Sequence, residues 1–202
     1  MYKFWLQMNL DAATSYAIKK LEPIEKTKYF YHNVYHSLDV FKSVATYGIS
    51  ENMDPTDLVL LKTAAIFHDI GIITSYENHE DASVKVIQEV LPGLGYNPEQ
   101  IETVGHLILA TRMPTNPQNH LEKLLCDADL DYLGREDYLE ISERLRLEWE
   151  VIRKIKYSEQ DWLDYQLSFL VTHNYYSQAA RMLRNAGKLL NIIKMEELLK
   201  KT

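Results

Sequence analysis

Apolar residues recur at spacings of three and four through nearly every segment of this 202-residue chain, and no segment alternates apolar and polar residues over a sustained run. The first pattern places apolar side chains on one face of a helix, whereas a half-buried strand needs the second. The fold is therefore predicted to be all-α. Because this length suffices for one sizeable core, we expect a single domain over residues 1–202.

Capping chemistry marks several helix starts. The stretch DPTD at residues 54–57 offers an N-cap, a proline at the first helical position and an acid at the third, and residues 97–100 and 158–161 repeat this logic. About nine helices follow from these signals and from the apolar spacing. They are expected at residues 5–22, 30–48, 55–71, 79–91, 98–111, 119–133, 136–156, 159–172 and 174–200.

Composition bears on the binding partners and on the cellular location that we expect for the chain. Its 22 Lys and Arg against 29 Asp and Glu give a net charge of −7, which disfavours a surface that grips a nucleic-acid polymer. The only cysteine, Cys126, excludes an intrachain disulfide. No apolar run approaches the roughly 20 residues of a membrane span, and the first residues lack a signal-peptide pattern. We expect a cytoplasmic protein without a membrane partner.

The stretch YHNVYHSLDV sets His32 and His36 four residues apart. On a helix over 30–48 the two imidazoles project from one face, about one turn apart. That face also carries Val40 and Val44, so it is expected to be buried. Buried imidazoles need either hydrogen-bond partners or a metal ion. The pair alone does not distinguish a structural role from a metal site.

A second pair, His68 and Asp69, ends a strongly apolar helix. Projected at about 100° per residue, both fall on the face of Leu58, Leu61 and Ala65, which points into the core. Burying a carboxylate there costs several kcal/mol unless a cation or hydrogen-bond donors compensate it. A hydrogen bond that ties two helices together is the structural alternative to a functional site.

The third cue is LLCDADLDYLG, which places three acids on one predicted helix. Asp129 and Asp131 flank the apolar face on either side, whereas Asp127 turns further away and suits a solvated acidic stripe. Two imidazoles and two carboxylates from three helices would form a mixed nitrogen and oxygen set. Such a set suits a divalent ion such as Mn, Fe, Zn, Ni or Mg, which promotes phosphoester hydrolysis.

The order His36, then adjacent His68 and Asp69, then Asp129, on an apparently all-helical chain, resembles the HD-domain superfamily of metal-dependent phosphohydrolases. The resemblance covers roughly residues 28–150. It implies that these four residues are the metal ligands.

The last ligand and the rest of the chain follow from the same resemblance. Asp129 is preferred to Asp127 because the last ligand of the family typically sits in an Ala-Asp-x-x pattern, and the face projection agrees. The helices over residues 159–200 are expected to pack on the HD core.

The segment HNVYHSLDV is also similar to the His-Asn-x-x-His-x-x-Asp-Val signature of class I cyclic-nucleotide phosphodiesterases. In those enzymes the first histidine protonates the leaving group, which implies that role for His32. The chain departs from that class in two ways. It is considerably shorter than their catalytic domains, and after the His-Asp pair it reads IGIITSYENHED, without their further histidines.

A closer overall likeness is to small bacterial proteins described as predicted HD phosphohydrolases. They share a Tyr-His-Asn-x-x-His opening, an acidic motif like NHEDAS, a segment like LILATRMP and an Asp-Ala-Asp-Leu-x-x-Leu-Gly segment. The likeness makes Glu80 a candidate to position or deprotonate the attacking water, with His79 as a further candidate at the site. Spacing alone equally allows Asn78 and Asp81 to start a helix there.

Several HD enzymes hold a second metal with extra histidines between the His-Asp pair and the last aspartate. His79, His106 and His120 lie in that interval, but Thr111 stands where such a histidine would be expected after LILA. One metal ion is therefore expected.

Three further features of the chain have both a functional and a structural reading. Arg112, with Lys123 nearby, could neutralise a substrate phosphate or face solvent at a helix end. The last helix is basic and amphipathic, so it packs on its own domain or meets a membrane or partner. His173 is expected to be structural.

These observations predict a metal-dependent phosphohydrolase that acts on a small phosphate ester, a nucleotide or cyclic nucleotide, with a homodimer as a candidate assembly. One alternative is a nucleotide-binding or sensory module that keeps the HD fold without hydrolysis. Another is an oxygen-using two-iron member of the wider fold, which would need the extra histidine that Thr111 replaces.

Overall fold

The computed structural model describes residues 7–24 and 27–201, and within them it contains helices and no strand. This confirms the all-α prediction. The α-helices are α1 (Leu10–Leu21), α2 (Val34–Ser50), α3 (Pro55–Phe67), α4 (His79–Val90), α5 (Pro98–Ala110), α6 (His120–Asp129), α7 (Tyr138–Ile152), α8 (Glu159–Thr172) and α9 (Gln178–Leu199). Short 3-10 segments are η1 (Glu22–Ile24), η2 (Ile70–Ile73), η3 (Leu91–Leu94) and η4 (Asp131–Gly134).

Three helices begin where their capping residues predict. The Asp54 carboxylate accepts a hydrogen bond from the Thr56 amide at 2.8 Å, and Ser158 caps α8 in the same way. Asn97 forms a full capping box, because its side chain and that of Gln100 each accept from the other residue's backbone amide at 2.9 Å. The local sequence therefore determines the starts of α3, α5 and α8.

The first and the last helix both start later than predicted. The first was expected at residue 5, but residues 7–9 are not helical and Asn9 caps α1; residues 5 and 6 lie outside the described part. The last was expected at residue 174, yet α9 begins after its cap, Ser177. The Asp127 carboxylate accepts from the amides of Tyr176, at 2.8 Å, and Ser177, at 2.7 Å, which holds this entry segment outside the helix.

Asp127 was expected on a solvated acidic stripe, and this prediction was wrong. The residue is fully buried at the base of α9, where backbone donors replace its water. Asp131 is also buried, and it accepts from the Arg184 guanidinium of α9 at 2.7 Å. The two acids therefore attach α9 and its entry segment to α6 and η4.

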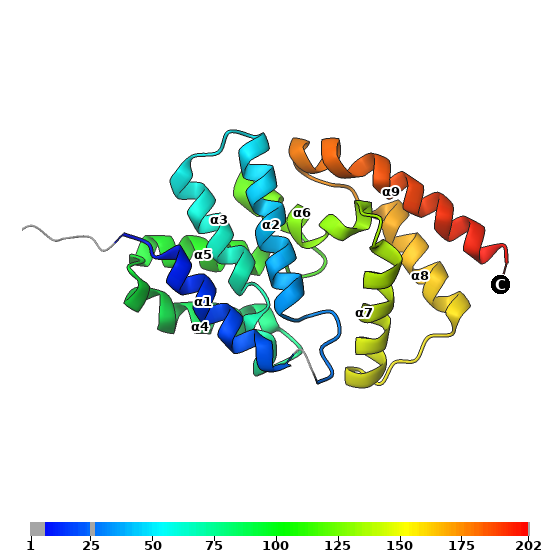
Figure 1. Cartoon of the computed structure of the whole chain (residues 1–202), viewed down its shortest axis with the longest axis horizontal. Helices are drawn as coiled ribbons and strands as arrows, with labels where there is room; N and C mark the ends of the chain where they lie inside the picture. Colours follow the sequence, from blue (N-terminus) through cyan, green and yellow to red (C-terminus); the bar gives the residue numbers. More distant parts are fainter. Residues whose placement is uncertain (1–6, 25–26, 202) are drawn as a thin grey trace, which may run out of the picture.

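The helices divide around α2. In Figure 1, α1, α3, α4 and α5 lie to one side of α2, while α7, α8 and α9 lie to the other, with α6 between the two groups. Helix α2 packs against both α3 and α6, and α3 packs against α5. Fully buried apolar side chains such as Leu61, Phe67, Ile108 and Leu125 fill the space between these helices.

Two close approaches depend on glycine. A Cβ on Gly71 would lie 2.1 Å from the carbonyl oxygen of His79 and 2.5 Å from the Ser83 nitrogen, so η2 meets α4 backbone to backbone. A Cβ on Gly187 would lie 2.1 Å from the Gly134 carbonyl oxygen, so α9 meets η4 equally closely. No helix in the described part of the chain is long and apolar enough to cross a lipid bilayer.

His173, expected to be structural, lies in the connection between α8 and α9. Both of its ring nitrogens are buried without a hydrogen-bond partner in the described structure, and its ring meets the Tyr175 ring edge-on at 4.6 Å. Burial, together with the smaller effect of the nearby Lys188 ammonium, lowers the pKa of His173 from 6.5 to about 4.

The His173 imidazole takes up a proton near pH 6.5 in the unfolded chain but only near pH 4 in the native protein. Protonation therefore favours the unfolded chain, and the free energy of unfolding falls as the pH drops from 6.5 towards 4. We expect His173→Phe to lessen the acid sensitivity of folding. Between pH 7 and pH 5 the free energy of unfolding of the variant should fall by about 2 kcal/mol less than that of the unsubstituted protein. Urea titrations of both proteins at the two pH values measure this difference, and equal losses would contradict it.

Candidate metal centre and substrate cavity

The His-Asp pair lies in a break between α3 and η2. The helix was expected to continue to residue 71, but it ends at Phe67, and His68 is its C-cap. The reason lies in α4: the Ser83 hydroxyl donates to the His68 carbonyl at 2.7 Å and accepts from the Gly71 amide at 2.8 Å. Because α4 takes over these backbone groups, the chain turns and presents His68 and Asp69 together.

His36 comes from the first turn of α2. Asn33 is the N-cap, and its side chain accepts from the Tyr35 amide at 2.9 Å. His32 therefore precedes the helix, and the prediction that His32 and His36 share one helical face was wrong.

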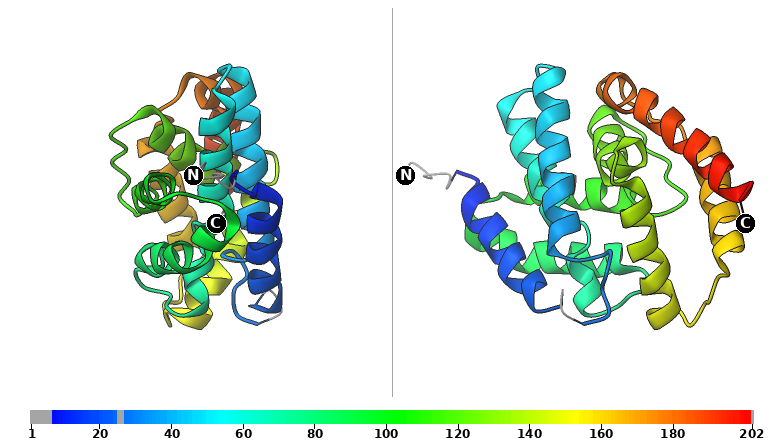
Figure 2. Two further views of the ribbon diagram at one scale, coloured as in Figure 1. Left: turned by 90° about the vertical axis from the view of Figure 1, so that its left-hand side faces the viewer. Right: turned by 45° about the vertical axis from the view of Figure 1, so that its right-hand side comes forward.

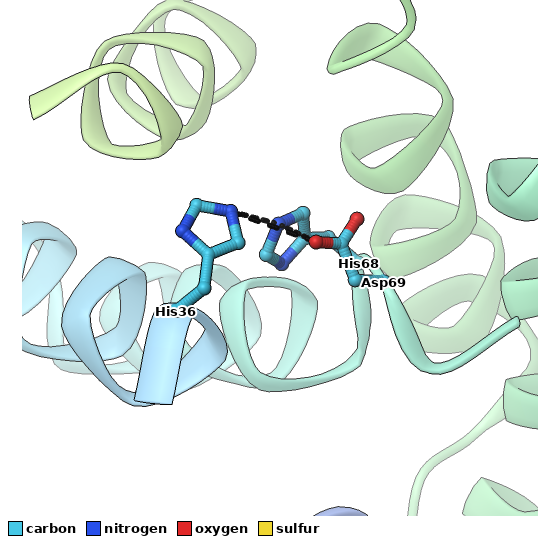
Figure 3. Close-up of side chains that lie close together, drawn as sticks. All are labelled: His36, His68 and Asp69. Carbon is cyan, nitrogen blue, oxygen red and sulfur yellow. Dashed lines mark hydrogen bonds and ion pairs between the residues drawn. The ribbon is translucent and has the colours of Figure 1, made fainter. Parts of the chain in front are cut away.

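Atoms from α2, the α3–η2 break and α6 meet at one point. The Nε2 atoms of His36 and His68 lie 3.3 Å apart, and the Asp69 Oδ2 atom lies 3.1 Å from His68 Nε2 and 3.5 Å from His36 Nε2 (Figure 3). The Asp129 Oδ1 atom, at the end of α6, lies 2.9 Å from His36 Nε2 and 3.4 Å from His68 Nε2. The structure thus brings together the four residues that the sequence singled out as ligands.

The chemistry of these donors fits a divalent cation. The His68 Nδ1 atom donates to the Ala65 carbonyl at 2.8 Å, which leaves the lone pair of Nε2 facing the carboxylates. Asp69 Oδ2 is buried and has no hydrogen-bond partner in the described structure. Lone pairs that converge on one another in a buried place repel unless a cation or a proton lies between them.

The pKa shifts of His68 and Asp69 reflect the same crowding of lone pairs and negative charge. Burial lowers the pKa of His68, but the carboxylates of Asp69 and Asp129 outweigh it and raise that pKa well above 6.5. Burial raises the pKa of Asp69, yet the neighbouring imidazoles hold it well below 3.8. The carboxylates thus favour positive charge among these side chains, and the binding of a cation there is expected to release protons.

His79 and Glu80 start α4 beside this centre. The His79 Nε2 atom lies 3.1 Å from Asp69 Oδ1, and its Nδ1 atom donates to the Tyr76 carbonyl at 3.0 Å. Burial lowers the pKa of His79, but Asp69 raises it to about 9. Glu80 is buried, 3.8 Å from His79 Nε2. Asn78 occupies the N-cap position of α4, but its side chain makes no capping hydrogen bond.

The other histidines proposed for a second metal lie elsewhere. His106 is exposed, and His120 is exposed and pairs with Glu51 at 2.7 Å. Of the three histidines considered for a second metal, only His79 lies beside the cluster of His36, His68, Asp69 and Asp129. Thr111 is buried and lines the cavity described next, where its hydroxyl donates to the Ile108 carbonyl at 2.8 Å.

A cavity of about 400 Å³ opens onto Asp69 and Asp129. Arg112 lines it, and its guanidinium lies 2.6 Å from Asp81 and 3.5 Å from Glu80. Its charge is therefore shared with two acids before any substrate binds. Lys123 is absent from the described cavity wall.

The far wall of the cavity is mainly aromatic and comes from α7, α8 and η4. Its members are Tyr132, Leu145, Trp149, Tyr165 and Phe169, with Gln166 between the last two. Gln166 is only 2% exposed, and the Tyr138 hydroxyl donates to its Oε1 atom at 2.9 Å. No acceptor for its amide N–H groups occurs in the described structure, so these donors remain available.

Glu148 of α7 is the functional candidate that sequence reasoning missed. Its fully buried carboxylate contacts the His32 Nδ1 atom and accepts from the amides of Tyr31, at 2.8 Å, and His32, at 3.0 Å. The Tyr76 hydroxyl donates to it at 3.0 Å. Although burial raises the pKa of Glu148, the His32 imidazole and these donors lower it overall. Glu148 therefore fixes His32 with its other nitrogen free at the cavity wall.

Comparison with known proteins agrees with this arrangement. The HD-domain family model matches residues 33–132, which include all four converging residues, and the chain belongs to the HD-domain superfamily. Membership of this superfamily, together with the cluster of His and Asp side chains, supports a metal-dependent hydrolase as the class of protein. An uncharacterized protein of Clostridium beijerinckii is 34% identical over 106 residues, which make up 50% of this chain and 67% of that protein.

Two solved structures share the fold. A predicted HD superfamily hydrolase from an uncultured Thermotogales bacterium has 16% identity and a TM-score of 0.64, covering 96% of this chain and 92% of that one. Bacillus subtilis YpgQ, solved in complex with ADP, has 18% identity and a TM-score of 0.70, covering 96% of this chain and 95% of that one. At these identities the likeness concerns the fold.

Proposed function

We propose that this protein is a metal-dependent phosphohydrolase that cleaves a phosphoester of a small molecule, a nucleotide or cyclic nucleotide. The observation that carries the proposal is the convergence of His36, His68, Asp69 and Asp129 at a cavity large enough for such a ligand. The orphaned Asp69 oxygen adds a buried negative atom that a cation would satisfy.

The residues around this point have distinct roles in the proposed reaction. A divalent ion held by the four ligands would acidify a bound water and polarise a phosphoryl oxygen. His32, held by Glu148 through one ring nitrogen, protonates the leaving oxygen with the other. Glu80 lies at the cavity wall, where it orients or deprotonates the attacking water.

The far wall supports a nucleotide as the substrate. The rings of Trp149 and Tyr165 offer faces on which a base can stack, and the Gln166 amide offers donors to a base carbonyl or ring nitrogen. Arg153, over Trp149 at 4.8 Å, and Arg112 place positive charge along the cavity for phosphate oxygens. The ADP bound by YpgQ, which shares this fold, points to the same ligand class.

Metal analysis and a substrate panel test this proposal. Protein purified without chelator should retain close to one divalent ion per chain, and with Mn or Mg it should hydrolyse some of a panel of nucleoside mono-, di- and triphosphates and cyclic nucleotides. Metal-loaded protein without turnover on any phosphoester would contradict the proposal. If that protein instead retained an unmodified nucleotide tightly, the non-hydrolytic binding module would replace it.

Gln166→Leu tests base recognition separately from chemistry. Loss of a buried donor pair to the base should raise KM for the preferred nucleotide by about 10-fold, because one such hydrogen bond contributes roughly 1–1.5 kcal/mol. Hydrolysis of bis(p-nitrophenyl) phosphate, which has no base, should change little. Gln166→Glu keeps the acceptor for Tyr138 and removes the donors, so it should reproduce the KM effect. Unchanged KM in both variants would refute this role.

A further inference from the structure

Tyr76 connects the candidate proton donor to the candidate metal centre. It belongs to the segment that joins η2 to α4, and it lines the substrate cavity. Its hydroxyl donates to the Glu148 Oε1 atom at 3.0 Å, and its carbonyl accepts from His79 Nδ1 at 3.0 Å. The other ring nitrogen, His79 Nε2, lies 3.1 Å from Asp69 Oδ1. One residue therefore contacts both the carboxylate that holds His32 and the imidazole beside the metal ligands.

The two oxygens of the Glu148 carboxylate have separate partners. Oε2 accepts from the backbone amides of Tyr31 and His32, so the segment that precedes α2 fixes the position of the carboxylate. Figure 1 and the right-hand view of Figure 2 show this segment, in blue, beside the lower half of α7. Oε1 contacts His32 Nδ1 and accepts from the Tyr76 hydroxyl. Because a carboxylate only accepts hydrogen bonds, both groups at Oε1 are donors, and each takes one of its lone-pair directions.

A purely structural role for the Tyr76 hydroxyl would be to satisfy a buried charge. Glu148 is fully buried, but two amides and the His32 imidazole already donate to it. The carboxylate therefore has three donors without Tyr76, so a fourth is not required to keep it buried. What the fourth donor determines is the side of Oε1 that remains open to His32.

The Tyr76 ring is held in place independently of its hydroxyl. It stacks on the Tyr29 ring at a centroid distance of 6.5 Å, and the Arg153 guanidinium lies 5.2 Å from its centroid. The His32 ring meets it edge-on at 5.8 Å. The ring alone makes these contacts, so a phenylalanine at this position would keep them. The hydroxyl can therefore be removed while the wall of the cavity stays in place.

We propose that Tyr76 is a positioning residue for the proton donor: its hydroxyl takes one lone-pair direction of Glu148 Oε1 and thereby confines His32 Nδ1 to the other. The His32 ring then has one orientation, with Nε2 directed at the leaving oxygen. Without the hydroxyl, the imidazole shifts towards the vacated direction, which moves Nε2 out of line with that oxygen. This inference rests on the proposed function, in which His32 protonates the leaving group.

Tyr76→Phe tests this role by kinetics. With a nucleotide as substrate, kcat should fall by about 10-fold, because a displacement of about 1 Å in a reacting group can cost about 100-fold and a smaller shift costs less. KM and the number of metal ions per chain should not change. Hydrolysis of bis(p-nitrophenyl) phosphate, whose leaving group needs no proton, should change by less than about two-fold. In a His32→Ala background, Tyr76→Phe should cost no further rate.

Tyr29→Phe is the matched control. It removes the hydroxyl from the ring that stacks on Tyr76, but this hydroxyl donates to the Ile72 carbonyl at 3.2 Å rather than to Glu148. The control should therefore leave kcat unchanged on both substrates. Comparable losses in Tyr29→Phe and Tyr76→Phe would show that packing of the two rings, and not the bond to Glu148, accounts for the effect, and would overturn the proposal.

NMR of the His32 ring tests its placement without turnover. Full-length protein labelled with nitrogen-15 histidine and loaded with Mg or Zn, which are diamagnetic, should show a downfield Nδ1 proton resonance that is absent from His32→Ala. This proton lies between His32 and Glu148, so its chemical shift reports their relative position. Tyr76→Phe should shift the resonance, and Tyr29→Phe should leave it in place.

Three results would overturn the proposal: an unchanged nucleotide kcat in Tyr76→Phe, an equal loss of rate on both substrates, or an unchanged His32 resonance. Failure of the proposed function gives a different result. The unsubstituted protein would then hydrolyse no phosphoester, while a shifted His32 resonance in Tyr76→Phe would still support the placement of the imidazole by Tyr76.

Discussion

Replacement of Asp69 by Ala is expected to remove the bound metal ion and to lower phosphoester hydrolysis by at least about 1000-fold. Asp69 faces both histidine Nε2 atoms, at 3.1 Å and 3.5 Å, and its other oxygen lies 3.1 Å from His79. No other carboxylate in the described structure contacts these three imidazoles together. The variant therefore loses one of the two proposed oxygen ligands.

Metal content measured by mass spectrometry and a thermal melt with and without added Mn provide readouts besides activity. A ligand that binds only the native state raises its melting temperature, so Mn should stabilise the unsubstituted protein and leave Asp69→Ala unchanged. The control is Asp81→Ala, an exposed acid at the start of α4 that pairs with Arg112. It should keep the metal. An Asp69→Ala protein that retains one ion per chain and its activity would contradict the assigned centre.

Helix ends were predicted correctly where the residues that fix them are close in sequence. Prolines and capping side chains next to the apolar run start α3, α5 and α8, and all of these groups lie within four residues of one another. The start of α9 was wrong because Asp127, about 50 residues away, binds the backbone of the entry segment. The end of α3 was wrong because Ser83 of α4 takes over its last groups. No local pattern encodes such distant partners.

The residues of the candidate site could also be predicted only where a short motif marks them. His36, His68, Asp69 and Asp129 could be proposed because three short motifs each carry their own signal and their order resembles a family. Glu148 has no motif around it, and its role depends on the meeting of α7 with the segment before α2. Only the structure shows that Glu148 lies with Tyr138 and Ser142 among the buried residues of α7.

His32→Ala is expected to retain the metal ion and to lower kcat for a nucleotide by about 100- to 10,000-fold, the range typical of a lost general acid. His32 is not one of the converging ligands, and its ring centroid lies 6.2 Å from that of His36. The metal centre should therefore survive its removal. A substrate whose leaving group needs no proton, such as a p-nitrophenyl phosphate diester, should lose much less rate. This difference between substrates separates proton donation from general damage to the site.

Glu148→Gln extends this test to the group that holds His32. The amide can still accept a hydrogen bond through its oxygen, but it lacks the negative charge that Glu148 directs at the His32 ring, so kcat should fall by about 10- to 100-fold. Because Glu148 is buried and accepts hydrogen bonds from two backbone amides, its replacement could also destabilise the fold. The melting temperature of the Glu148→Gln protein must therefore be measured together with kcat. Adding Glu148→Gln to His32→Ala should cost little further rate, since the two residues act as one unit. If the kcat losses of the two single variants multiplied in the double variant, His32 would not be the proton donor. The same conclusion would follow if His32→Ala lost equal rate on the nucleotide and on the p-nitrophenyl diester.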